Sequence, residues 1–167
     1  MSIAPRIEAH LSKTGIHYDL VEHSESSTSL DSVKSANIPS SQMAKAVMTH
    51  DGETYRLCVI PASHKLVIPW LNNHMQGNYR LIAEAELKTI FDDCELGAVP
   101  ALGQVYGLPV IWDQSLMQMQ DIYFESGDHK NLVHVDHGAF MELMGLQEND
   151  VISYPSDSPE SNSYLTH

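Results

Sequence analysis

The chain carries the stretch Gly97-Ala98-Val99-Pro100-Ala101-Leu102-Gly103, a short apolar loop bracketed by two glycines and interrupted by a proline. Glycine tolerates positive φ and lets a ligand approach the main chain, while proline fixes its own φ and has no N–H group. The N–H groups of such a loop can face an ester carbonyl and stabilise the oxyanion that develops on it. The structural alternative is a tight turn between a helix and a strand.

A lysine set among small and apolar residues is the second candidate feature. Lys45, in the run Met43-Ala44-Lys45-Ala46-Val47, is the only charged residue between Lys34 and Asp51 when histidine is counted as neutral. It is either an exposed residue on a solvated strand face or a cation that points into a cleft and binds a phosphate or carboxylate. Lys65 is a weaker candidate for the same role, because its surroundings resemble an exposed loop.

Composition and charge exclude several classes of protein. With 167 residues, 43% of them hydrophobic and 19% charged, the chain fits one soluble globular domain. Its apolar runs are far shorter than the roughly 20 residues of a membrane span, and residues 1–13 lack the pattern of a secretory signal. We therefore expect a cytoplasmic protein without membrane contact. The excess of 22 acidic over 9 basic residues, a net charge of −13, argues against strong unaided nucleic-acid binding.

Metal and cofactor sites are not expected. Cys58 and Cys94 are isolated, form no Cys-x-x-Cys pair and are predicted to be free buried thiols. His129, His134 and His137 cluster with two aspartates, but they would fall on a turn, a strand face and a helix start rather than around one ion. The chain also lacks Gly-x-Ser-x-Gly, His-Glu-x-x-His and Gly-x-x-x-x-Gly-Lys motifs, so we expect no protein nucleophile, no metal and no cofactor.

Apolar periodicity predicts more strands than helices, in an order that does not alternate strictly. Ser2 is expected to cap the first helix, Gly15 and Gly145 to end the first and last, and Asp51-Gly52 to form a hairpin. The pattern favours an α+β fold with a mixed, curled, barrel-like sheet flanked by helices. Helices are expected at residues 2–13, 29–36, near 69–75, 84–90 and 137–144, and strands at 18–21, 44–49, 55–60, 79–82, 108–112, 121–125 and 132–135.

The domain is expected to span residues 1–148. From Asn149 onward, Pro155 and Pro159 stand among serines and acids with few large apolar residues. Such a composition is typical of a flexible tail, so residues 149–167 are expected to stay outside the core.

In these features and their order, the chain resembles the YbaK/ProX family of aminoacyl-tRNA editing domains over roughly residues 3–145. The resemblance rests on Glu22-His23, the lysine strand at Lys45, the run Val59-Ile60-Pro61-Ala62, the glycine loop and the turn Gly127-Asp128-His129. Family members look like a mixed β-barrel flanked by helices, with a pocket between the lysine strand and the loop. Their activity is hydrolysis of the ester that joins a wrong amino acid to the terminal ribose of tRNA.

The resemblance also implies roles for particular residues. Lys45 would anchor the tRNA end through phosphate, the backbone of residues 101–103 would hold the substrate carbonyl, and His129 would orient the substrate or the water. The attacking water would be activated by the substrate's own ribose hydroxyl, without a metal. The implied catalytic residues are Lys45, Gly103 and His129, and the implied substrate-binding residues are Lys45, Pro100, Ala101, Leu102, Gly103 and Gly127.

The chain departs from the family pattern at two places. Ala101 and Leu102 stand where many members have a second proline or a phenylalanine, and Ala46 stands where some deacylases have a polar residue. The resemblance therefore leaves open which amino acid is removed. It predicts a deacylase that acts in trans and binds tRNA weakly, with a synthetase as a further partner. The alternatives are a non-catalytic module that binds an amino acid, a tRNA end or a synthetase, and a hydrolase of another small ester or amide.

Overall fold

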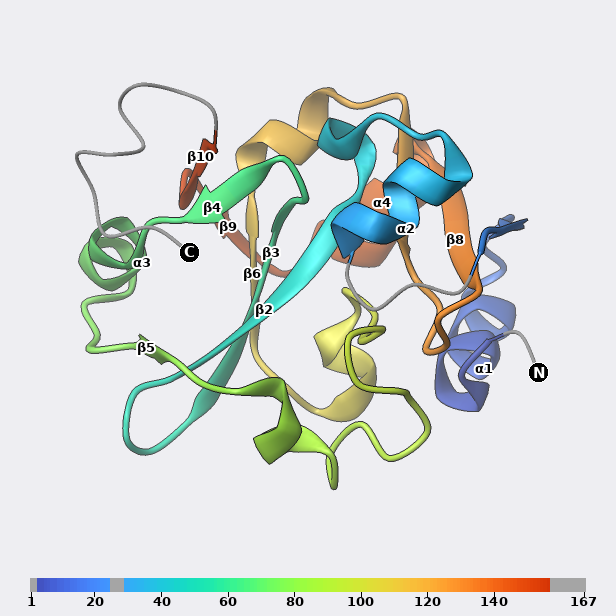
Figure 1. Cartoon of the computed structure of the whole chain (residues 1–167). Helices are drawn as coiled ribbons and strands as arrows, with labels where there is room; N and C mark the ends of the chain where they lie inside the picture. Colours follow the sequence, from blue (N-terminus) through green and yellow to red (C-terminus); the bar gives the residue numbers. More distant parts are fainter. Residues whose placement is uncertain (1–2, 25–28, 157–167) are drawn as a thin grey trace.

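The computed structural model describes residues 3–24 and 29–156, which form an α+β fold (Figure 1). The α-helices are α1 (Pro5–Thr14), α2 (Ser29–Ala36), α3 (Ile68–Met75) and α4 (His137–Met144). The strands are β1 (Asp19–Glu22), β2 (Ala44–His50), β3 (Tyr55–Pro61), β4 (His64–Leu66), β5 (Arg80–Leu81), β6 (Val110–Asp113), β7 (Asp121–Glu125), β8 (Asn131–Asp136), β9 (Glu148–Asp150) and β10 (Ser153–Pro155). Short 3₁₀ helices are η1 (Ser40–Gln42), η2 (Glu84–Leu87), η3 (Gly103–Tyr106) and η4 (Gln114–Gln118).

The strands form mixed sheets, as predicted. The largest has the order β5-β2-β3-β6-β9, in which β3 pairs antiparallel with β2 and parallel with β6. A second sheet has the order β1-β8-β7, and a third consists of β10 and β4. The expected curled, barrel-like sheet is not found among the described residues. A single bridge between Met43 and Tyr123 joins the region of β2 to β7, so the two larger sheets stay separate.

The hairpin of β2 and β3 forms where Asp51-Gly52 predicted it. Gly52 has a φ of 102°, and the Asp51 carboxylate accepts hydrogen bonds from the backbone N–H groups of Glu53 and Thr54 at 2.9 and 2.7 Å. These bonds, with the one from Thr54 first, lower the pKa of Asp51. The aspartate therefore fixes the turn by satisfying backbone donors that no strand partner reaches.

Alternation along this hairpin separates the two larger of three buried clusters. Ala44, Met48, Leu57 and Val59 face a large cluster that also holds residues of α1, α4 and the glycine loop, here called the first core. Cys58 and Ile60 face the other way and pack with β4, α3 and β6 in the second core, which contains Leu66, Leu71, Ile111 and Ile152. Both sides of β3 are thus buried, which accounts for the apolar run in its sequence.

Two expected helices differ from the prediction. The first begins at Pro5 after Ala4 rather than at Ser2, which lies outside the described residues, and it ends at the predicted Gly15 with a φ of 69°. Residues 84–90 form only η2 and single turns, with i to i−3 bonds from the N–H groups of Glu86 and Lys88 to the carbonyls of Ala83 and Ala85. In the described part of the chain, no helix is long and apolar enough to cross a membrane.

The expectation that the core ends before Asn149 is wrong for residues 149–155. β9 pairs parallel with β6, β10 pairs antiparallel with β4, and Ile152 between them is fully buried in the second core. The buried carboxylate of Asp113 accepts hydrogen bonds from the N–H groups of Ile152 and Ser153 at 2.8 and 3.0 Å. The composition of this segment predicted a flexible tail, but the buried side chain of Ile152 and the carboxylate of Asp113, distant in sequence, hold the segment in the fold. Residues 157–167 of the expected tail lie outside the described residues.

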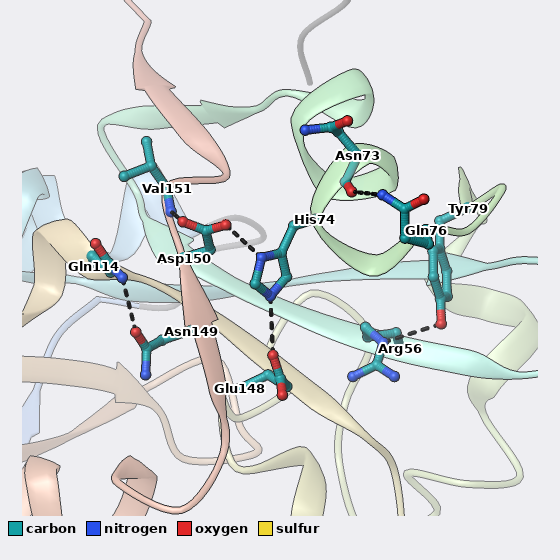
Figure 2. A network of polar contacts seen from close by, with 10 residues as sticks. All are labelled: Arg56, Asn73, His74, Gln76, Tyr79, Gln114, Glu148, Asn149, Asp150 and Val151. Carbon is teal, nitrogen blue, oxygen red and sulfur yellow. Dashed lines mark hydrogen bonds and ion pairs between the residues drawn. The ribbon is translucent and has the colours of Figure 1, made fainter.

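Polar contacts also join this C-terminal segment to α3 and η4 (Figure 2). The ring of His74 lies between two carboxylates of β9, with Nε2 3.0 Å from Glu148 Oε2 and Nδ1 2.5 Å from Asp150 Oδ2. The side-chain amide of Gln114 donates to Asn149 at 3.0 Å. The His74 ring therefore links α3 to both carboxylates of β9.

If Ile152 anchors this segment, truncating its side chain should destabilise the whole fold. We expect Ile152→Ala to lower the free energy of unfolding by about 2–5 kcal/mol, because it leaves a cavity in the second core. The adjacent Val151 is 53% exposed, so Val151→Ala is the matched control and should change stability by less than about 0.5 kcal/mol. Denaturant titration of both variants checks this. Equal small effects would show that residues 149–155 do not contribute to the core.

Candidate functional site

Lys45 lies on β2 opposite Ile60 of β3 and is half-buried. Burial, and then the nearby charge of Lys65, lower the pKa of its ammonium group. Among the residues that the structure describes, none accepts a hydrogen bond from Lys45 or forms an ion pair with it. A desolvated cation without a counter-ion is unfavourable for the fold, and an external anion would relieve that.

Lys65, the weaker candidate, lies on β4 and is exposed. The fold brings it close enough to Lys45 for its charge to act there. No described carboxylate pairs with Lys65 either. The two lysines are therefore interacting positive charges without a described carboxylate partner, in a chain whose net charge is −13.

The glycine loop is a packed element rather than an exposed turn. Ala98, Ala101 and Leu102 are almost completely buried in or beside the first core. The backbone N–H groups of Ala101, Leu102 and Gly103 donate to no acceptor in the described part of the chain. Ala101 and Leu102 immediately precede η3, and Gly103 is its first residue. At the start of a helix the first N–H groups have no hydrogen-bond acceptor within the helix.

The two glycines of this loop have different physical roles. Gly97 has a φ of 84°, a left-handed conformation that favours glycine. At Gly103 a Cβ atom would lie 2.9 Å from both Leu57 Cδ2 and Val110 Cγ2, so close packing requires glycine there. The tight fit explains Gly103 without a ligand, and its role toward a substrate stays a prediction.

The turn Gly127-Asp128-His129 lies beside the base of the loop. Gly127 has a φ of 109°, and a Cβ atom there would lie 2.7 Å from the Cβ of Ala4. The N–H of His129 donates to the Glu95 carboxylate at 3.1 Å, and the N–H of Glu95 donates to the Gly127 carbonyl at 2.8 Å. His129 is half-buried in this arrangement. Glu95 thus joins two segments that the sequence analysis singled out separately.

Lys45 is not joined to the loop in the same way. By alternation along β2, Lys45 shares a strand face with Val47, which packs against the second core. Ala101 and Leu102 belong to the first core, on the other side of the sheet. A common pocket of Lys45 and the loop therefore stays a prediction from the resemblance.

The histidine cluster separates into structural contacts. His134 stacks on Tyr123 with ring centroids 4.7 Å apart, and its Nε2 lies 2.8 Å from Asp121 Oδ1. His137 begins α4, where Asp136 accepts a hydrogen bond from the N–H of Ala139. Within the described ranges no three His, Cys, Asp or Glu side chains converge as metal ligands would. Cys58 is buried and Cys94 half-buried, and both are free thiols.

A buried acid near the Gly127 turn is not predicted by the sequence patterns. Glu125 ends β7, two residues before Gly127, and its carboxylate accepts a hydrogen bond from the Ser32 hydroxyl at 3.2 Å. Both side chains are almost completely buried. The only hint in the sequence is an acid that follows an aromatic strand run, a pattern also typical of an exposed strand end.

Comparison with known proteins identifies the family. A model of the aminoacyl-tRNA editing domain matches residues 23–143, which is more than half of the chain. The chain therefore belongs to the aminoacyl-tRNA editing domain family, as the resemblance predicted. No curated protein matches it.

Several solved structures have a similar fold at low sequence identity. The hypothetical protein APE2540 is 17% identical, with a TM-score of 0.79 over 89% of this chain and 99% of that one. A candidate trans-editing enzyme for prolyl tRNA synthetase is 19% identical, with a TM-score of 0.75 over 89% and 96%. A candidate signal transduction protein from Marinobacter aquaeolei VT8 is 14% identical, with a TM-score of 0.71 over 89% and 30%. At these identities the likeness establishes the fold.

Because Gly103 is required by packing, Gly103→Ala should destabilise the protein by about 1–3 kcal/mol through overpacking against Leu57 and Val110. Gly138 in α4 is the control, since a Cβ there meets only Asp136 Oδ1 at an ordinary 3.6 Å. Gly138→Ala should leave stability unchanged or slightly higher. Thermal unfolding of both variants distinguishes them. A Gly103→Ala protein of normal stability would show that the loop has room for a side chain.

Removing Lys65 should raise the pKa of Lys45, because one of the two causes that lower it disappears. The folded pKa of Lys45 lies below that of the unfolded chain, so the unfolded state binds this proton more tightly. Lys65→Gln should therefore also stabilise the protein below that pKa. The pH dependence of Lys45 acylation, followed by peptide mass spectrometry, measures the shift. An unchanged profile would mean that the two charges do not interact.

Proposed function

We propose that this protein is a trans-acting aminoacyl-tRNA deacylase that hydrolyses the ester bond of mischarged tRNA. Family membership supports an editing role, and the proposal adds the reaction itself. A synthetase pocket discriminates one methylene group by only about 10- to 200-fold, while translation needs about 10⁴- to 10⁵-fold. A separate hydrolase that removes wrong amino acids supplies the missing discrimination.

The half-buried Lys45, which has no counter-ion among the described residues, is the observation that carries this proposal. A lysine selected only for stability would be exposed or paired with a carboxylate. The phosphate of a tRNA acceptor end supplies the negative charge that the protein itself does not provide there. Lys45 would thus anchor the substrate by a charge-assisted contact.

The reacting carbonyl would be held by backbone groups of the loop. The N–H groups of Ala101, Leu102 and Gly103 have no described acceptor, which leaves them available as donors. Such donors stabilise the oxyanion of the tetrahedral intermediate. The ribose hydroxyl next to the ester would activate the water, and His129 would orient the water or the substrate. Pro100 and Gly127 would complete the substrate-binding backbone.

The partners follow from the substrate. With a net charge of −13, the protein would bind tRNA weakly and through few phosphates. A synthetase that presents its mischarged product would compensate for weak capture. We place this activity in the cytoplasm, where charged tRNA is used, and without a metal or other cofactor.

The test is deacylation of tRNAs that carry small wrong amino acids, with alanine, serine and cysteine first. Lys45→Met should reduce the rate by about 10- to 150-fold, which corresponds to loss of one charge-assisted contact of about 1.5–3 kcal/mol. The same variant should be as stable as the natural protein or more so, because it removes an unpaired, half-buried charge.

Lys13→Met is the control for loss of a positive charge, since Lys13 lies exposed in the last turn of α1. It should keep full activity. A Lys45→Met protein with full activity would contradict the role of Lys45. Absence of turnover with every charged tRNA, together with stabilisation by an amino acid or a tRNA end, would instead favour the non-catalytic binding module.

A further inference from the structure

Glu95 joins the start of the glycine loop to the turn of residues 127–129 through its backbone and its side chain. Its N–H donates to the Gly127 carbonyl at 2.8 Å, and its carboxylate accepts a hydrogen bond from the N–H of His129 at 3.1 Å. Its own carbonyl accepts a hydrogen bond from the N–H of Ala98 at 3.1 Å. Two segments that are distant in the sequence are therefore bonded to one residue.

The bond from Ala98 to Glu95 also determines how the glycine loop begins. It closes a four-residue turn over residues 95–98, in which Gly97 is the third residue and has a φ of 84°. Leu96, the second residue, does not have a positive φ. A positive φ at the third position alone is the pattern of a type II β-turn. The loop thus leaves from a turn whose first residue is Glu95.

The far end of the loop returns to the same segment. Tyr106, the last residue of η3, donates its hydroxyl hydrogen to Asp93 Oδ1 at 2.8 Å. Burial first, and then hydrogen bonds to Cys94 and Asp93, raise the pKa of Tyr106, so its hydroxyl keeps the hydrogen that it donates. The other carboxylate oxygen of Asp93 accepts a hydrogen bond from the N–H of Arg6 in α1 at 3.1 Å. Residues 93–106 therefore form a compact loop whose two ends are held together.

The turn that carries His129 has internal support of its own. Asp128 Oδ1 accepts hydrogen bonds from the N–H groups of Lys130 and Asn131 at 2.9 and 2.8 Å. The N–H of His129, between Asp128 and Lys130 in the chain, donates to Glu95 instead. Asp128 thus supports the shape of the turn, whereas Glu95 connects the turn to the loop.

We propose that Glu95 is a positioning residue for the proposed deacylase and holds the backbone of His129 in place relative to the N–H donors of residues 101–103. The inference rests on the proposed function, because that function assigns the water or substrate to His129 and the substrate carbonyl to the loop. Groups that act on one ester must keep a fixed separation, and a displacement of about 1 Å can cost about 100-fold in rate. Glu95 itself contacts no substrate and acts through His129.

Steady-state kinetics with a mischarged tRNA test this role. Glu95→Ala removes the acceptor, so kcat should fall by about 10- to 100-fold while KM changes by less than about two-fold. Glu95→Gln keeps an oxygen that accepts the same hydrogen bond, so it should keep kcat within about three-fold of the natural value. Glu142→Ala, at an exposed acid of α4, is the control for loss of a negative charge and should change neither constant. Equal losses in Glu95→Ala and Glu95→Gln would overturn the proposal, because charge rather than the hydrogen bond would then be decisive.

A double-mutant cycle tests whether Glu95 acts through His129. In a protein that already carries His129→Ala, the further change Glu95→Ala should lower kcat by less than about two-fold, because the group that it positions is absent. A loss of the same size with and without the His129 side chain would overturn the proposal, since Glu95 would then act independently of it.

Hydrogen exchange gives a readout that does not depend on catalysis. In Glu95→Ala the amide hydrogen of His129 should exchange about 10-fold faster or more, because its acceptor is lost. The amides of Lys130 and Asn131, which are bonded to Asp128, should keep their rates. Unchanged exchange at His129 would overturn the role of Glu95 even if kcat fell. Absence of hydrolysis by the natural protein would refute the proposed function, whereas hydrolysis that Glu95→Ala leaves unchanged would refute the positioning role alone.

Discussion

The pairing of β2 with β3 is the constraint on which the other features depend. β3 is the central strand of the largest sheet and is covered on both sides, so alternation assigns the apolar residues of the β2 and β3 strands that pack in these two clusters to one core or the other. Ala44 and Met48 must face the first core, and Lys45 between them must face away from it. A shift of one residue in this register would bury the ammonium group against α1 and α4, which is energetically prohibitive. The position of the candidate cation is therefore a consequence of the same register that forms the core.

Lys45 and Lys65 have no ion-pair partner among the described residues, whereas several other titratable side chains of the fold have polar partners. His74 lies between Glu148 and Asp150, and the carboxylate of Asp113 accepts four hydrogen bonds. Lys45 and Lys65, whose charges act on each other, have no such partners in the described structure. A site that lowers stability without a compensating contact is typical of a binding site, where the ligand provides the missing interaction. In an acidic protein, the proposed phosphate contact would depend on these lysines rather than on a broad basic surface.

The C-terminal segment shows how a few contacts extend a domain. The family model ends at residue 143, yet β9 and β10 complete the sheets and cover the second core. Asp113, at the end of β6, holds the backbone of Ile152 and Ser153, and this places β10 beside β4. That pairing positions both Tyr154 and Lys65. The segment is thus part of the architecture around β4 and the second core.

The sequence by itself determined the α+β class, most strands, the Asp51-Gly52 hairpin, the end of α1 at Gly15 and the family, because these depend on local periodicity, turn chemistry and motif order. Only the tertiary structure decided that the strands divide into three sheets, that Gly103 is required by packing against Leu57 and Val110, and that the charge of Lys65 acts on Lys45. It also decided that residues 149–155 join the core. These features depend on contacts between residues far apart in the chain, such as Asp113 with Ile152. Composition and periodicity describe neighbours along the chain and carry no information about such partners.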